Sequence, residues 1–301
     1  MRSGGPCLTA GIVLVASAAW SQPDRLRFEA AGSEFVFDTG ELSGKLREGG
    51  RALGLSRVVH GPTGAILSRG MGLLSHYRVF TSGRRYGDGA WDWPGEARVN
   101  PEGEVEVLWP GDSGRPFELA AVYRWRRAGW VEVETSVKAN EELIDFEVFL
   151  ASYFSKDFNF AAARADAPAR WVEASPEQGV WQIFPRDPAA LALIRDGRWK
   201  IPPSPVDWAI RPNLAAPLAM RRARRLGLVA VLMGRPGDCF AVAMPHHDEP
   251  HYSLYLSLFG RTIPAGERAR ARACLAILRD SEMDRIEAMY GEWLSGPAAE
   301  R

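Results

Sequence analysis

Side chains of alternating polarity run through most of this sequence, and this pattern constrains the fold more than any other feature. Residues 104–107, 131–134 and 146–149 each alternate charged with bulky apolar side chains. Neighbouring side chains on a β-strand point to opposite faces, so a period of two predicts strands with one buried face. Gly- and Pro-containing turn signals separate such stretches, as at residues 100–103 and 110–114. The pattern predicts an all-β fold, a large antiparallel sandwich of many short strands.

The length sets the number of domains that such a sandwich can have. The chain has 301 residues, and no repeat, low-complexity tract or clear linker divides it. We therefore expect one β-super-sandwich domain over residues 22–301. Apolar residues fall on one helical face at residues 281–294, which predicts a short C-terminal helix.

The N-terminal segment has the pattern of an export signal. Arg2 precedes an apolar run at residues 8–20, and the small residues Ala19 and Ser21 stand at its end. A run of 13 residues is short against the roughly 20 that a membrane-spanning helix needs. We expect a cleaved signal peptide over residues 1–21 and a periplasmic or extracellular protein with no membrane partner. The alternative is that the segment stays as an N-terminal anchor.

Charge and motif content disfavour several classes of function. The chain has 37 basic and 37 acidic residues. It therefore has no net positive charge with which to displace counterions from phosphates, and we expect no nucleic-acid partner. The sequence contains no Gly-rich phosphate loop, no CxxC pair, no GxSxG elbow and no HExxH helix. We expect no cofactor and assign no metal ligand.

Two cysteines follow the N-terminal segment, Cys239 and Cys274, each in a stretch with strand character. In an oxidising compartment they can form a disulfide if their Cα atoms come within about 7 Å. Two buried free thiols are the other interpretation, and both stay open.

The densest group of titratable residues lies at residues 246–251, where three histidines accompany Asp248 and Glu249. Imidazole titrates near neutral pH and a carboxylate can act as a base, so such a loop can transfer a proton at a sugar carbon. The candidate catalytic residues are His76, His246, His247 and His251. A solvated hairpin loop and a metal site are the alternatives for the loop.

Arginine, aspartate and tryptophan gather in a second group at residues 78–93. An aromatic plane packs against the C–H face of a sugar ring, while arginine and aspartate hydrogen-bond its hydroxyls. A planar guanidinium also suits the carboxylate of a uronate. The candidate substrate-binding residues of this group are Arg78, Arg84, Arg85, Trp91, Asp92 and Trp93. Core packing of the tryptophans is the alternative.

A third group lies in connections that are longer than ordinary hairpins. Long ordered loops on a sandwich often carry function. The candidate substrate-binding residues here are Arg186, Asp207, Trp208 and Arg211. The alternative is an Arg–Asp pair that only locks a loop.

Four segments carry a resemblance to known proteins: residues 74–94, 181–187, 207–212 and 251–260 resemble an uncharacterised group of exported bacterial proteins. The succession of strands is similar to the galactose mutarotase-like super-sandwich of the aldose epimerases, which implies sugar ligands on a concave sheet face. Aldose epimerases use two mid-chain histidines and a glutamate near the chain end, whereas residues 77–245 here contain no histidine. The resemblance therefore implies a ligand class and carries over no catalytic residue.

These observations together predict a secreted carbohydrate-recognising protein. As an enzyme it would transfer a proton at an anomeric or uronate carbon, as an epimerase or a polysaccharide lyase does. The alternative is a non-catalytic carbohydrate-binding or structural module of the periplasm. The enzyme interpretation requires His76 and the loop at residues 246–251 to reach one sugar in one pocket.

Overall fold

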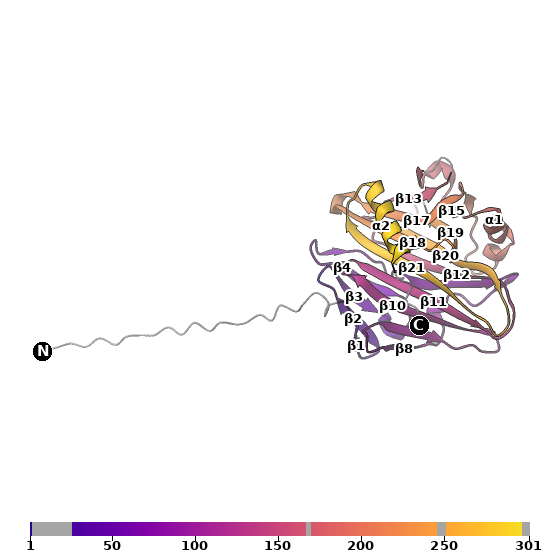
Figure 1. The fold of residues 1–301 in the computed structure, drawn as a ribbon, viewed down its shortest axis with the longest axis horizontal. Coiled ribbons are helices and arrows are strands. Elements are labelled where there is room, and N and C mark those ends of the chain that lie inside the picture. Colours follow the sequence, from indigo (N-terminus) through magenta and orange to yellow (C-terminus); the bar gives the residue numbers. More distant parts are fainter. Residues whose placement is uncertain (2–25, 167–169, 246–250, 297–301) are drawn as a thin grey trace.

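Three β-sheets make up most of the computed structural model, which describes residues 1, 26–166, 170–245 and 251–296 (Figure 1). Neighbouring strands run antiparallel, apart from the parallel pair β15 and β16. The predicted all-β super-sandwich is confirmed.

The first sheet is a meander of five strands in the order β1-β2-β3-β4-β5. Its strands are β1 (Glu29–Ala31), β2 (Glu34–Asp38), β3 (Leu42–Leu46), β4 (Leu55–His60) and β5 (Ala65–Ile66).

The second sheet has nine strands in the order β14-β13-β17-β18-β21-β11-β10-β9-β8. Its strands are β8 (Glu96–Val99), β9 (Val105–Trp109), β10 (Phe117–Arg127), β11 (Trp130–Ala139), β13 (Phe160–Ala165), β14 (Arg170–Glu173), β17 (Leu214–Ala223), β18 (Leu228–Gly234) and β21 (Arg268–Arg279).

The third sheet has seven strands in the order β16-β15-β19-β20-β12-β6-β7. Its strands are β6 (Ser75–Thr81), β7 (Arg84–Arg85), β12 (Leu143–Tyr153), β15 (Trp181–Pro185), β16 (Ala209–Ile210), β19 (Cys239–Pro245) and β20 (Ser253–Ile263). Short 3-10 helices connect several strands: η2 (Glu48–Gly50), η3 (Ala90–Asp92), η4 (Pro176–Gln178), η5 (Arg198–Lys200) and η6 (Arg224–Leu226).

The main core lies between the nine-stranded and seven-stranded sheets. Phe117 of β10 meets Phe146 of β12 with ring centres 5.2 Å apart. The five-stranded sheet joins the same core through Phe37, whose ring centre lies 4.8 Å from that of Trp125. Each fully buried ring of this kind contributes about 2 kcal/mol of transfer free energy. The alternating pattern of the sequence therefore has its predicted effect, because every second side chain enters this layer.

Helix α2 (Met283–Ser295) covers the outer face of the nine-stranded sheet, across β18 and β21 (Figure 1). Its buried residues are Ile286, Met289, Tyr290 and Trp293. They pack against side chains such as Met220 and Val231. The predicted C-terminal helix is confirmed.

The outer face of the seven-stranded sheet is covered by the chain between β15 and β16. This connection contains α1 (Pro188–Arg195) and η5, and we call it the covering segment. The Asp187 side chain accepts a hydrogen bond from the Ala190 backbone N–H and caps α1. Because of the covering segment, β12 is buried on both faces. The expectation that residues 146–149 form a half-buried strand is therefore wrong for Glu147, which is fully buried.

Cys239 and Cys274 are both buried free thiols. Cys239 belongs to the core between the sheets, whereas Cys274 belongs to the cluster beneath α2. The sequence leaves open a disulfide or two buried free thiols, and in the structure both cysteines are free thiols.

Candidate functional site

A β-bulge in β6 turns two consecutive side chains toward the outer face of the seven-stranded sheet. The register of β6 against β12 shifts between His76 and Val79, so Tyr77 and Arg78 together oppose Phe149. A bulge leaves one residue of a strand unpaired and re-aims the side chains around it. Tyr77 and Arg78 both line the cavity described below, whereas His76 faces the core.

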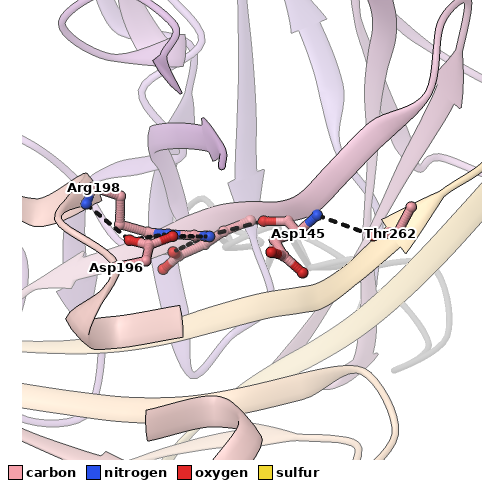
Figure 2. A network of polar contacts seen from close by, with 5 residues as sticks. Asp145, Asp196, Arg198 and Thr262 are labelled. Atoms are coloured by element: carbon pink, nitrogen blue, oxygen red, sulfur yellow. Dashed lines mark hydrogen bonds and ion pairs between the residues drawn. The ribbon is translucent and has the colours of Figure 1, made fainter. Parts of the chain in front are cut away.

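The opposite wall of this cavity belongs to the covering segment, which a buried arginine fastens to β12. Arg198 of η5 donates from Nη1 to the Glu147 carboxylate at 3.0 Å and to the Asp145 carbonyl at 3.0 Å. Its Nη2 donates to Asp196 at 2.7 Å, and Figure 2 shows Arg198 between Asp196 and the backbone of Asp145. Burial raises the pKa of Glu147, and the charge of Arg198 opposes that shift. This network fixes the position of Trp199, the next residue along the chain.

Between β12, β20 and the covering segment lies a cavity of about 190 Å³. This volume corresponds to about six water molecules at roughly 30 Å³ each. Seven of its twelve lining residues are aromatic: Tyr77, Phe149, Tyr153, Trp181, Trp199, Trp208 and Tyr255. The other five are Arg78, Ser204, Pro205, Val206 and His251. We call this space the aromatic cavity.

The rings of the aromatic cavity support one another. Phe149 stacks on Tyr255 with ring centres 4.7 Å apart. Trp208 stands edge-on to Trp199 at 5.0 Å and to Trp181 at 6.2 Å. Edge-to-face and offset contacts of this kind are the favoured arrangements of aromatic pairs. The walls are therefore defined by packing, and a ligand would meet flat apolar faces.

Hydroxyl groups and one imidazole lie at one side of the aromatic cavity. Ser253 donates its hydroxyl hydrogen to the Tyr255 hydroxyl at 2.7 Å. The His251 ring centre lies 5.4 Å from that of Trp181 and 6.1 Å from that of Tyr153. Burial raises the pKa of Tyr255 to about 12 and that of Tyr153 well above its ordinary value. Both tyrosines are thus protonated near neutral pH and can act as hydrogen-bond donors.

Several buried donors at this cavity have no hydrogen-bond partner within the described part of the chain. They are Nε and Nη1 of Arg78 and the indole N–H groups of Trp199 and Trp208. Native proteins pair the great majority of buried polar groups, so each exception asks for an explanation. A ligand with several oxygen atoms would satisfy these donors.

Three of the predicted site residues line the aromatic cavity: Arg78, Trp208 and His251. His76 is not among them. Its Nε2 lies 2.8 Å from the Thr135 hydroxyl and its Nδ1 lies 3.2 Å from the Tyr123 hydroxyl, inside the core. Burial lowers the pKa of His76 to about 3. The expectation that His76 and His251 share one pocket is therefore wrong, because the bulge places His76 on the other face of the sheet. His246 and His247 lie outside the described residues.

The predicted residues of β7 and η3, and Trp93, do not line the cavity. Arg85 donates to backbone carbonyls of residues 87, 88, 201 and 203, and so joins the β7 turn to the covering segment. Arg84 is exposed and donates to a carbonyl at residue 114. Trp91 stacks on Tyr77, with ring centres 4.1 Å apart, and supports the cavity from behind. Two further members make contacts elsewhere: Asp92 with Arg51, and Trp93 with Arg115.

Three predicted residues of the third group contact other residues of the protein and do not line the aromatic cavity: Arg186, Asp207 and Arg211. Arg186 pairs with Asp187 at 2.7 Å, which is the arrangement that the loop-locking alternative describes. Asp207 pairs with Lys200 at the surface. The guanidinium of Arg211 lies over the ring of Phe184 at 5.7 Å.

Sequence reasoning did not assign Tyr77, Tyr153, Trp181 or Tyr255 to the site. Tyr153 and Tyr255 lie near the ends of β12 and β20, which pair with each other. The sequence shows that each of these two strands has an aromatic residue near one end. It does not show that the two strands are neighbours, so it could not bring the two tyrosines together.

Two further observations concern the described residues. They include no cluster of three or more His, Cys, Asp or Glu side chains that could hold a metal ion. None of their helices is long and apolar enough to cross a bilayer. Apart from these, an open groove of about 910 Å³ is lined by both polar and apolar residues, among them the ion pair of Asp157 and Arg225.

No protein-family model matches this sequence, and no curated protein does. Solved structures do match most of the chain. An α-N-acetylgalactosaminidase, NagBb from Bifidobacterium bifidum, is 11% identical with a TM-score of 0.51, over 89% of this chain and 39% of the enzyme. A GalM/aldose epimerase homologue from C. elegans is 8% identical with a TM-score of 0.48, over 85% of this chain and 99% of that one. A galactose mutarotase-like protein from Clostridium acetobutylicum is 10% identical with a TM-score of 0.46, over 85% and 99%. At such low identity the likeness concerns the fold alone.

Proposed function

We propose that this protein binds a carbohydrate ring in the aromatic cavity. The observation that carries the proposal is a cavity of about 190 Å³ with seven aromatic lining residues and four buried donors that have no partner in the described chain. The C–H face of a sugar packs on an aromatic plane, and its hydroxyl and ring oxygens accept hydrogen bonds. The small volume supports a single ring as the bound unit. The N-terminal pattern of residues 1–21 supports action in the periplasm or outside the cell.

Binding can be tested with the purified chain and a panel of monosaccharides and methyl glycosides. Because three tryptophans line the aromatic cavity, bound sugar should change the intrinsic fluorescence and raise the melting temperature. Trp208→Ala should weaken binding by about ten-fold or more, since it removes one aromatic face and one donor. Trp171→Phe is the matched control, because Trp171 lies on β14 and bonds Glu287 away from the cavity. If no saccharide in the panel alters either signal, the proposal is wrong.

A second candidate function is proton transfer on the bound sugar, as in an epimerase or a lyase. It is favoured by His251, which lines the same cavity as Arg78 and three tyrosines. An imidazole can remove a proton, a tyrosine can donate one, and a guanidinium can stabilise negative charge that develops on oxygen. The test combines two NMR measurements: exchange of a ring C–H hydrogen in D₂O, which epimerisation or elimination beside a carboxylate requires, and interconversion of the anomers, which moves the hydroxyl proton and leaves the C–H bonds intact. His251→Gln should abolish the activity that is found and leave binding in place, whereas binding with neither activity in the unaltered protein would favour a non-catalytic module.

A further inference from the structure

The hydrogen-bond and ion-pair partners of the buried Arg78 differ from those of the other buried arginines. Its side chain is 4% exposed. Nη2 donates to the Ser204 carbonyl at 2.7 Å and to the Tyr77 hydroxyl at 3.4 Å, while Nε and Nη1 have no partner among the described residues. The guanidinium carbon lies 5.0 Å from the ring centre of Tyr77 and 5.2 Å from that of Trp199. Arg78 is thus held in the wall of the aromatic cavity by one carbonyl, one hydroxyl and two rings.

Two other fully buried arginines show how this protein satisfies such a group elsewhere. Arg198 bonds the carboxylates of Glu147 and Asp196. Arg221 donates to three backbone carbonyls, at residues 158, 245 and 253. A buried cation without compensation is costly, so these partners are expected. Arg78 lacks an equivalent set within the described chain.

The remaining lining of the cavity offers no compensating charge. Its described residues are aromatic, aliphatic, hydroxyl-bearing or imidazole side chains, and none of them is a carboxylate. The charge of Arg78 is also felt by Arg85, whose pKa is lowered first by burial and then by that neighbouring cation. An aromatic cage can bind a ligand cation, but the guanidinium in this wall would repel one. An anionic ligand would supply the compensating charge that the described lining of the cavity lacks.

We infer that the ring bound in the aromatic cavity carries a carboxylate, which pairs with Arg78. This inference rests on the proposed carbohydrate-binding function and names its ligand class, a uronic acid or a residue of an acidic polysaccharide. One unpaired guanidinium balances one negative charge, and its planar N–H groups match the two oxygens of a carboxylate. A neutral hexose would offer hydrogen-bond acceptors to Arg78 but no negative charge to balance the guanidinium. A hexose phosphate would bring nearly two charges to one cation.

Calorimetric titration of the full chain with matched ligands tests the inference. The ligands are D-glucuronate, its uncharged methyl ester, D-glucose and D-glucose 6-phosphate, with the D-galacto series measured in parallel. Uronate should bind about ten-fold or more tightly than its ester and the hexose, because hydrogen bonds to a charged group exceed neutral ones by about that factor. The ester keeps the ring and most of the shape, so this comparison needs no protein variant.

A variant series locates the effect. Arg78→Met should reduce uronate binding by a larger factor than ester binding and so bring the two affinities close together, while Arg78→Lys should keep part of the preference. Arg98→Gln is the matched control, because Arg98 lies on β8 at the surface and pairs with Glu106. Far-UV circular dichroism checks that each variant is folded, and the ester comparison stands if one is not.

The outcomes separate this inference from the proposed function. Equal binding of uronate, ester and hexose would overturn the inference and leave the proposed function intact. Tighter binding of the 6-phosphate would overturn the carboxylate assignment. If acetate binds as tightly as uronate, or if no sugar binds at all, the carbohydrate proposal fails and the inference falls with it.

Discussion

Arg198 donates to Glu147 at 3.0 Å, and neither side chain is exposed to solvent. Breaking a buried pair by removing one partner costs roughly 3–5 kcal/mol, since it leaves an uncompensated charge. Arg198→Met leaves the buried carboxylate of Glu147 without its ion-pair partner and also removes the ion pair with Asp196. Glu147→Gln still leaves Arg198 beside Asp196. We expect Arg198→Met to lower the free energy of unfolding by about 3–5 kcal/mol, and Glu147→Gln by less, as measured by urea denaturation.

The same variants should loosen the covering segment. Limited proteolysis should cut Arg198→Met within residues 198–208 faster than it cuts the unaltered chain. Equal stability and equal cleavage rates for the variant and the parent protein would contradict the anchoring role of this pair.

Replacement of Arg221 should be among the most destabilising single changes. Arg221 is fully buried, and burial lowers its pKa to about 9. Arg221→Met leaves three buried carbonyls without their donor, each at a cost of about 1–3 kcal/mol. The neighbouring Arg222→Met is the control, because Arg222 forms a partly exposed pair with Asp280 that contributes about 0–1 kcal/mol. A smaller loss for Arg221→Met than for Arg222→Met in thermal denaturation would contradict this prediction.

The buried His76 should make the fold sensitive to acid. Because burial lowers its native pKa to about 3, the unfolded chain takes up a proton that the folded chain does not as the pH falls below the ordinary histidine value. This linkage should cost roughly 2 kcal/mol of unfolding free energy between about pH 7 and about pH 5. His76→Gln removes the titrating ring, so its loss over that interval should be smaller by that amount. Parallel pH profiles for the two proteins would exclude the effect.

The two described cysteines should be unreactive thiols in the folded protein. Burial raises the pKa of Cys239 to about 12 and that of Cys274 well above its ordinary value, and the thiolate is the reactive form. In a Cys7→Ser variant, Ellman's reagent should label neither thiol under native conditions and both in concentrated guanidinium chloride without reductant. Denatured protein that stays unlabelled would instead indicate a disulfide.

The alternating pattern was sufficient to predict the strands and the class of the fold. Residues 104–107 and 131–134 lie in or beside β9 and β11, as their period predicts. Helical periodicity at residues 281–294 likewise predicted α2, because an amphipathic helix buries its apolar face by packing on the surface of a sheet.

The candidate site could be predicted only in part, because the sequence assigns His76 and Arg78 to one carbohydrate site. The bulge opposite Phe149 breaks the period of two and sends them to opposite faces. A bulge depends on the register with a partner strand, which sequence spacing does not encode. Glu147 was predicted to be exposed because the period of two places it on the outer face of its strand. The covering segment, which is distant in the sequence, buries that face. Signal-peptide cleavage and the single-domain boundaries stay predictions.

Arg221 joins two stretches that the sequence separates, because its Nη2 donates to the Pro245 carbonyl at 2.9 Å and its Nε donates to the Ser253 carbonyl at 3.0 Å. One guanidinium thereby bridges the end of β19 and the start of β20, in addition to the hydrogen bonds between these two strands. Since doubling the length of a loop costs only about 0.6 kcal/mol, an epitope or reporter peptide grafted between these two anchors should leave both sheets unchanged.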